Sequence, residues 1–129
     1  MREIIIVDSD ILIDASRGEF NAISYLEELE RNSDIAVSAI TEMELLVGSQ
    51  NKRELLATEK FLNRFTTLFL NEHISQLTID LLKKHHLSHG LLMADGIIAA
   101  TAISLQFPLV SKNQRDYRFI EDLDLIPYP

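Results

Sequence analysis

The chain has 129 residues, of which 47% are hydrophobic and 25% charged, with a formal net charge of −8. This composition is typical of a globular protein and excludes an intrinsically disordered chain. It contains no cysteine, which excludes disulfides and thiolate metal sites and favours a reducing, cytoplasmic location. No apolar run approaches a membrane span and no signal-peptide pattern opens the chain, so we expect no membrane partner. The acidic balance lacks the basic footprint of most nucleic-acid binders and points to solubility, a basic partner or a metal site.

Strand-like and helix-like segments alternate along the chain. Residues 4–7 are four consecutive β-branched residues, which predict a strand buried on both faces, and Ser9 or Asp10 can cap the helix that follows. This alternation requires crossover connections. We therefore expect an α/β fold, with a mainly parallel sheet of four to five short strands flanked by helices, in one domain over residues 1–129. Further strands are expected at 35–38, 67–70, 108–111 and 125–127, and further helices at 21–31, 39–47, 52–65, 74–85 and 93–105.

Four acids follow predicted strands or begin predicted helices. Asp8 comes directly after the first strand, and Glu44 lies in the helix after the second. Asp95 opens the apolar helix at 93–105, and Asp116 follows the fourth strand. Because the carboxyl ends of parallel strands share one edge of a sheet, these acids can converge there. Two carboxylates about 4 Å apart repel by roughly 4 kcal/mol, so such a cluster needs a dication or must retain protons.

The segments around these acids resemble those of the PIN domain, with the spacing of the VapC-type toxins of bacterial and archaeal toxin–antitoxin pairs. The resemblance covers essentially the whole chain. It implies a PIN-like fold, a metal-dependent endoribonuclease that hydrolyses RNA with metal-activated water, a homodimer, and inhibition by a VapB-type antitoxin. Operator DNA would be reached only through that antitoxin. The segments that carry the resemblance are residues 7–13, 41–45 with Gly48, 95–101 and 109–117.

The same resemblance implies which residues form the site. Asp8, Glu44, Asp95 and Asp116 match the acidic quartet of the family, as catalytic residues and as ligands of Mg²⁺, or alternatively Mn²⁺. Carboxylate oxygens are the hard ligands that these ions prefer. We expect Asp8 and Asp95 to contact the metal directly, with Glu44 and Asp116 nearby as ligands of the metal or of its water. Asp10 stands where the family commonly has Asn or Ser, and it either adds a fifth carboxylate or only caps the helix.

Polar residues close to the fourth acid are candidates for binding substrate. Ser111 and Asn113 could position a phosphate or a carboxylate by hydrogen bonding. Lys112 and Arg115 are the best placed cations for RNA phosphates, and the alternative is that they pair with local acids.

Several of these residues have structural interpretations. Thr41 and Glu44 fit a Thr-x-x-Glu capping box, Asp95 suits a helix N-terminus, and Asp116 could be an ordinary loop acid. His85 and His89 have the spacing of a helical zinc pair, but the acidic base of the His-Glu-x-x-His motif is missing, so we favour a loop cluster.

Two other functions compete. An apolar strand that ends in Asp8-Ser9-Asp10 resembles a phosphatase of the haloacid dehalogenase type, with Asp8 as nucleophile. Against it, Leu12 stands where Thr or Val is usual, and the chain is short. The second alternative is a non-catalytic PIN-like interaction module, against which the complete acidic quartet argues.

Overall fold

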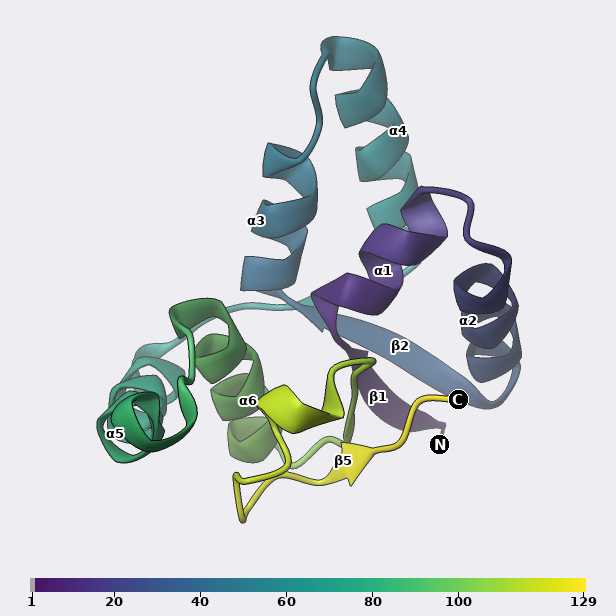
Figure 1. Ribbon diagram of the computed structural model, residues 1–129. Coiled ribbons are helices and arrows are strands. Elements are labelled where there is room, and N and C mark those ends of the chain that lie inside the picture. The colour runs from purple at the N-terminus through teal and green to yellow at the C-terminus, as the bar shows by residue number, and fades with distance from the viewer. Residues whose placement is uncertain (1) are drawn as a thin grey trace.

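A five-stranded sheet forms the centre of the computed structural model, which describes residues 2–129 (Figure 1). All four strand pairings are parallel, which confirms the predicted α/β fold. The strands follow one another in the order β3-β2-β1-β4-β5, so β1 lies at the centre. They are β1 (Glu3–Val7), β2 (Ser33–Ser38), β3 (Thr66–Leu68), β4 (Leu109–Val110) and β5 (Leu125–Ile126).

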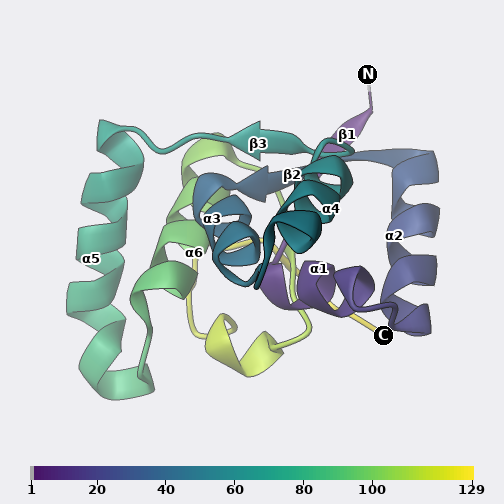
Figure 2. The same ribbon diagram turned by 90° about the horizontal axis from the view of Figure 1, so that it is seen from above.

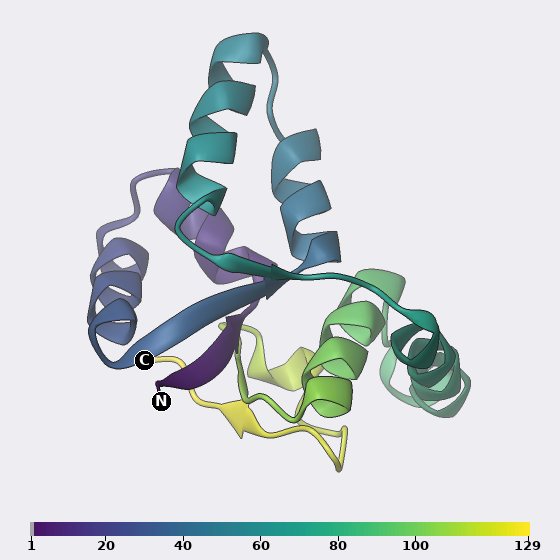
Figure 3. The same ribbon diagram turned by 180° about the vertical axis from the view of Figure 1, so that it is seen from behind.

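Helices cover both faces of this sheet. Figure 2 shows α5 and α6 on the opposite side of the molecule from α2. In Figure 1, α3 and α4 form a pair that projects away from the sheet. Figure 3 shows the chain running from α4 through β3 to α5. The helices are α1 (Ser9–Ser16), α2 (Phe20–Asn32), α3 (Ala39–Val47), α4 (Lys52–Leu62), α5 (Glu72–His89) and α6 (Met93–Leu105), and a 3₁₀ turn η1 spans Gln114–Asp116.

Side-chain alternation along the strands divides the interior into two cores. Ile5 and Val7 of β1 pack on the side of α1 and α2, whereas Ile6 packs on the side of α5 and α6. Leu109 and Val110 of β4 divide in the same way. Successive residues of a strand point to opposite faces, so a strand buried on both faces is apolar throughout. This burial holds the end of β1, and with it Asp8, rigidly in the sheet.

Two helices differ from the predicted ones by three residues or more. The helix predicted over 52–65 ends at Leu62, and Phe65 is buried in the segment that leads into β3. The helix predicted over 74–85 extends from Glu72 to His89. It begins earlier because Asn71 accepts a hydrogen bond from the Ile74 amide at 2.8 Å, and it ends where Gly90 adopts a left-handed φ of 72°.

The extension of α5 corrects the interpretation of the histidines. His85 and His89 lie on the last turns of this helix and not in a loop. The His89 ring stacks on Phe119 at 4.3 Å between centroids, and His85 packs 4.9 Å from the same ring. They form an aromatic contact between α5 and the C-terminal segment. Within residues 2–129, no helix combines the length and hydrophobicity that crossing a bilayer requires.

Candidate metal and catalytic site

Asp8 lies at the carboxyl end of β1 and is almost completely buried, with 4% of its surface exposed. Its Oδ1 accepts a hydrogen bond from the Ser9 amide at 2.9 Å, so Asp8 itself caps α1, and the prediction of Ser9 or Asp10 as N-cap was wrong. Its Oδ2 accepts a hydrogen bond from Ser111 Oγ at 2.7 Å. Burial, followed by repulsion from Asp10, raises the pKa of Asp8 to about 7, although these hydrogen bonds oppose the shift.

Asp95 meets Asp8 at a shared hydroxyl group. It lies in the first turn of α6 and is partly buried. The Tyr117 hydroxyl is 3.1 Å from Asp95 Oδ1 and 3.1 Å from Asp8 Oδ1. Burial raises the pKa of Asp95, and the charges of Asp116, Glu44 and Asp10 raise it further. The two acids that we expected to contact a metal directly are therefore neighbours.

Tyr117 was not among the residues singled out in the sequence. An aromatic residue after a turn is typical of a core position, and Tyr117 is indeed buried, with 1% of its surface exposed. The only available signal was its place directly after Asp116, because a buried tyrosine usually needs a partner for its hydroxyl.

Glu44 approaches the site from α3 with an exposed side chain. Its Oε1 accepts a hydrogen bond from Ser9 Oγ at 2.7 Å, and the Ser9 hydroxyl also contacts Thr41 Oγ1 at 2.9 Å. The capping-box interpretation of Thr41 and Glu44 was wrong, because Ser38 is the N-cap of α3. Glu44 therefore does not cap α3. Its hydrogen bond with Ser9, the residue after Asp8, holds it close to Asp8.

Asp10 and Asn113 are directly bonded, which places both at the same edge. Asn113 Nδ2 donates to Asp10 Oδ2 at 2.7 Å, and the Asn113 amide donates to Ser111 Oγ at 3.0 Å. Burial raises the pKa of Asp10. Its carboxylate also influences the pKa of both Asp8 and Asp95, as expected of a close neighbour.

The remaining predicted residues lie around η1. Asp116 is exposed at the end of this turn, close enough to Asp95 for its charge to raise the pKa of that residue. Lys112 pairs with Asp14 at 2.7 Å, which favours its structural alternative, whereas Arg115 is exposed and has no ion pair within residues 2–129.

The acids gather at one edge without closing into a complete ligand set. Within residues 2–129, no three His, Asp or Glu side chains converge closely enough to hold an ion between them. Instead, the acids are linked through hydroxyl groups: Tyr117 contacts Asp8 and Asp95, and Ser9 contacts Glu44. The donors are nevertheless hard oxygens, they repel one another, and the cation beside them, Lys112, is engaged by Asp14. This chemistry fits a divalent cation.

Comparison with known proteins agrees with this geometry. The sequence model of the PIN domain family matches residues 5–121. The chain is 34% identical over 120 residues to the ribonuclease VapC19 of Mycobacterium tuberculosis, and the match covers 92% of this chain and 95% of that protein. The chain belongs to the PIN domain family. This PIN domain is also 29% identical to a ribonuclease VapC of Rickettsia bellii, over 97% of this chain and 96% of that protein.

Solved structures of similar fold come from toxin–antitoxin complexes. This PIN domain superimposes on a chain of a toxin–antitoxin complex from Klebsiella pneumoniae with a TM-score of 0.79 and 27% identity, covering 95% of each chain. It also superimposes on a chain of VapBC2 from Rickettsia felis, bound to a promoter DNA fragment, with a TM-score of 0.81 and 25% identity. That match covers 98% of this chain and 99% of the other.

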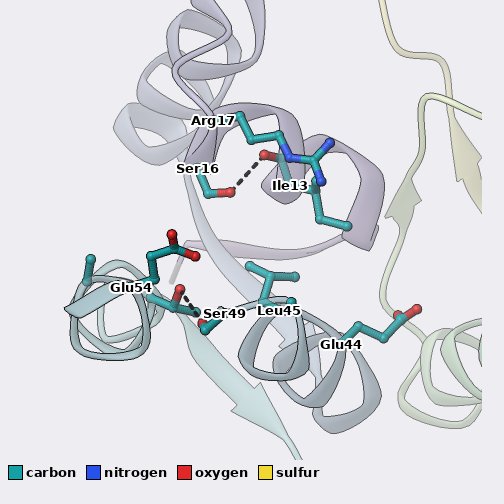
Figure 4. Close-up of a pocket in the computed structure, with 10 residues that line it drawn as sticks. Ile13, Ser16, Arg17, Glu44, Leu45, Ser49 and Glu54 are labelled. Atoms are coloured by element: carbon teal, nitrogen blue, oxygen red, sulfur yellow. Dashed lines mark hydrogen bonds between the residues drawn. The ribbon is translucent and has the colours of Figure 1, made fainter. Parts of the chain in front are cut away.

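A groove of about 370 Å³ lies beside the acidic edge of the PIN domain, between α1, α3 and α4 (Figure 4). Leu45 and Ile13 form part of its apolar lining, and Arg17 and Glu54 contribute charges. Glu44 stands at its border, and its side chain points away from Glu54 in Figure 4. The groove and the acidic edge therefore share Glu44, so a molecule that fills the groove also reaches the site.

Proposed function

We propose that this PIN domain, spanning residues 1–129, is the metal-dependent endoribonuclease toxin of a toxin–antitoxin pair. One observation carries the proposal: Asp8 and Asp95, brought together from β1 and α6, meet at a single buried hydroxyl at the carboxyl edge of the sheet. The charge of Asp10 raises the pKa of both acids, and the charges of Glu44 and Asp116 raise the pKa of Asp95. Unrelated structural acids have no reason to gather in this way, because each additional like charge costs free energy. The VapC relatives are themselves named ribonucleases.

In the proposed reaction the acids of this edge would hold Mg²⁺ or Mn²⁺ at the place where the RNA phosphate binds. Asp8 and Asp95 would hold the ion directly, with Glu44 and Asp116 as outer ligands. A dication bound there would lower the pKa of a water molecule and offset the charge that develops on the phosphate. Ser111 holds Asp8 in place, and Asn113 holds Asp10. Arg115 is exposed beside the site and is the better candidate for an RNA phosphate, because Lys112 is paired with Asp14.

The direct test is RNA cleavage by the purified chain. Total RNA is incubated with the protein in Mn²⁺, in Mg²⁺ and in EDTA, and the cut ends are mapped by sequencing. We expect defined cut sites with either metal and none in EDTA. Equal cleavage in EDTA, or no cleavage by wild type in any metal, would contradict the proposal.

The same samples test for an aspartyl-phosphate on Asp8, which the phosphatase alternative requires. Metal binding without cleavage would favour the non-catalytic module.

We propose that the antitoxin occupies the groove between α1, α3 and α4. A peptide segment lying there would reach Glu44 and so the acidic edge, and would thereby block access to the site. The net charge of −8 favours a basic segment and predicts that the complex weakens as salt increases. Contact with operator DNA would then come through the antitoxin. Leu45 is buried in the wall of the groove, so replacing it would disturb the core. Ala57 is exposed and lines the groove from α4, so Ala57→Arg should block antitoxin binding and spare RNA cleavage.

We also propose a homodimer through the outer face of α5 and α6. Apolar side chains are exposed on this face, including Ile79 at 47%, Leu92 at 63% and Met93 at 73%. Leu92 and Met93 line an apolar hollow of about 730 Å³ together with Leu82 and Leu91. Ile79 lines a second hollow of about 270 Å³, to which Leu82 and Met93 also contribute. Exposed apolar surface of this kind marks an interface between proteins. Sedimentation equilibrium should give twice the chain mass for wild type and the single chain mass for Met93→Glu.

A further inference from the structure

The buried tyrosine between the two central acids has a feature that a purely structural residue does not need. Tyr117 packs its ring into the core on the side of α5 and α6. Its hydroxyl is the one polar atom of the side chain, and it contacts both Asp8 Oδ1 and Asp95 Oδ1 at 3.1 Å. The hydroxyl has one hydrogen and donates to one carboxylate at a time, but it lies within hydrogen-bond distance of two acids on different elements.

This contact limits how far apart the two carboxylate oxygens can lie. Each is 3.1 Å from the same atom, so their separation cannot exceed twice that distance, 6.2 Å. Two oxygen ligands of one Mg²⁺ lie at most about 4.2 Å apart, because the ion holds each at roughly 2.1 Å. The two oxygens therefore lie at most about 2 Å farther apart than one ion would hold them, with a neutral hydrogen-bond donor between them.

The position of the hydroxyl is itself fixed by the surrounding chain. The Tyr117 amide donates to the Gln114 carbonyl at 3.2 Å, and the Ile120 amide donates to the Tyr117 carbonyl at 3.0 Å. Gln114 Nε2 in turn donates to the carbonyls of Ser111 at 2.6 Å and Ile126 at 3.0 Å. These bonds tie the turn that carries Tyr117 to the ends of β4 and β5. The position of the hydroxyl is thus fixed relative to the same sheet that holds Asp8.

We propose that Tyr117 is a positioning residue of the metal site, and that its hydroxyl holds Asp8 and Asp95 ready to bind a divalent cation. The inference rests on the proposed function, since it assigns the pair to a metal. Tyr117 acts through the two acids and needs no contact with RNA. Groups that orient metal ligands typically contribute a factor of about 10–100 in metal affinity.

The test compares Tyr117→Phe with Tyr25→Phe in the full chain. Both variants lose one hydroxyl from a tyrosine ring, but Tyr25 lies on α2 and contacts the Tyr128 ring at 4.9 Å instead of the acids. Mn²⁺ binding is measured by isothermal titration calorimetry without RNA, and folding is checked by circular dichroism. We expect Tyr117→Phe to fold and to bind Mn²⁺ about 10–100-fold more weakly than wild type, with Tyr25→Phe unchanged.

A second measurement separates positioning from general loss of structure. In a double-mutant cycle, Tyr117→Phe should weaken Mn²⁺ binding much less in an Asp95→Asn background than in wild type, because its effect runs through that pair. Equal Mn²⁺ affinity of Tyr117→Phe and Tyr25→Phe, or fully additive losses in the cycle, would overturn the inference while leaving the nuclease proposal intact. If wild type neither binds Mn²⁺ nor cuts RNA, the proposed function fails and the inference fails with it.

Discussion

The two edges of the parallel sheet both carry acids, but their surroundings differ. At the amino edge, where β2 begins, Asp34 pairs with Arg2 at 3.6 Å between Oδ1 and Nε. Arg2 also donates to the Ser33 carbonyl at 2.8 Å. Close by, Glu30 pairs with Arg64. These two acids each have a guanidinium beside them, so the protein itself balances their charges.

At the carboxyl edge, no guanidinium balances the charges of the acids within residues 2–129. Asp8, Asp10 and Asp95 lie within mutual electrostatic reach, and the pKa of each is raised, first of all by burial. The neighbouring cation, Lys112, is bonded to Asp14, and its charge lowers the pKa of Asp10 by less than burial raises it. The hydrogen bonds that the acids receive come from neutral hydroxyl, amide and backbone groups. Acid content alone is therefore uninformative, and a site is indicated where buried acids lack cations of the chain's own.

The largest effect expected from this comparison is on RNA cleavage. On the proposed function, Asp95→Asn or Asp8→Asn would remove a carboxylate ligand of the dication, at a cost of several kcal/mol of transition-state stabilisation. Cleavage in Mn²⁺ should fall by roughly a thousandfold. Asp34→Asn is the matched control at the amino edge and should cut RNA like wild type. A folded Asp95→Asn protein with full activity would refute the assignment.

A smaller effect is expected at the outer acids. Glu44→Gln retains an oxygen that can accept from Ser9 but removes the charge, so the Mn²⁺ concentration for half-maximal cleavage should rise about 10–100-fold. Glu42→Gln is the control on the same helix, because Glu42 accepts from Thr67 Oγ1 at 2.8 Å, away from Asp8. Indistinguishable metal dependence of the two variants would remove Glu44 from the site.

The effect of Asp8 on thermal stability should depend on pH, because no Lys or Arg pairs with its buried carboxylate within residues 2–129. The pKa of Asp8 is raised from 3.8 to about 7 in the folded chain, so ionisation disfavours folding, and stability present below pH 4 is lost as the pH rises toward 7. In EDTA at pH 8, Asp8→Asn should therefore raise Tm by about 5 °C, the shift that about 1 kcal/mol produces in a domain of this size. The gain should vanish at pH 4. A lower Tm for Asp8→Asn at pH 8 would contradict this expectation.

The smallest effect is expected at the amino edge. Arg64→Ala removes the pair with Glu30 and the stacking of the guanidinium over Phe61 and Phe65 at 5.5 and 5.3 Å. Such partly exposed contacts are worth about 1 kcal/mol or less, measurable by urea denaturation, and the ionic part should shrink in 0.5–1 M salt. Cleavage should not change. A large loss of activity in Arg64→Ala would mean that the two edges are coupled.

Much of the fold follows from local sequence. The apolar segment of β1 and the helices at Ala39–Val47 and Met93–Leu105 appear where the periodicity predicts them. Boundaries that depend on caps were less accurate, because neighbouring residues compete for the cap. Asp8 caps α1 in place of Ser9 or Asp10, and Asn71 starts α5 two residues before the predicted start. A pattern of apolar residues fixes the face of a helix more firmly than its end.

The site was predictable in its acids but not in their hydrogen bonds. Asp8 and Asp95 stood out because each lies at a strand end or a helix start, and these positions share one edge in a parallel sheet. The Tyr117 bridge spans 109 residues to Asp8, and no local pattern encodes a contact of that range. The pairing of Lys112 with Asp14, at 98 residues, was left open for the same reason.

The most direct test is to locate the ion. Crystals of the chain grown or soaked in Mn²⁺ would be measured at a wavelength where manganese scatters anomalously. The account predicts an anomalous peak within coordination distance of carboxylate oxygens of both Asp8 and Asp95. No peak at that pair in millimolar Mn²⁺, or peaks only at other surface acids, would contradict it.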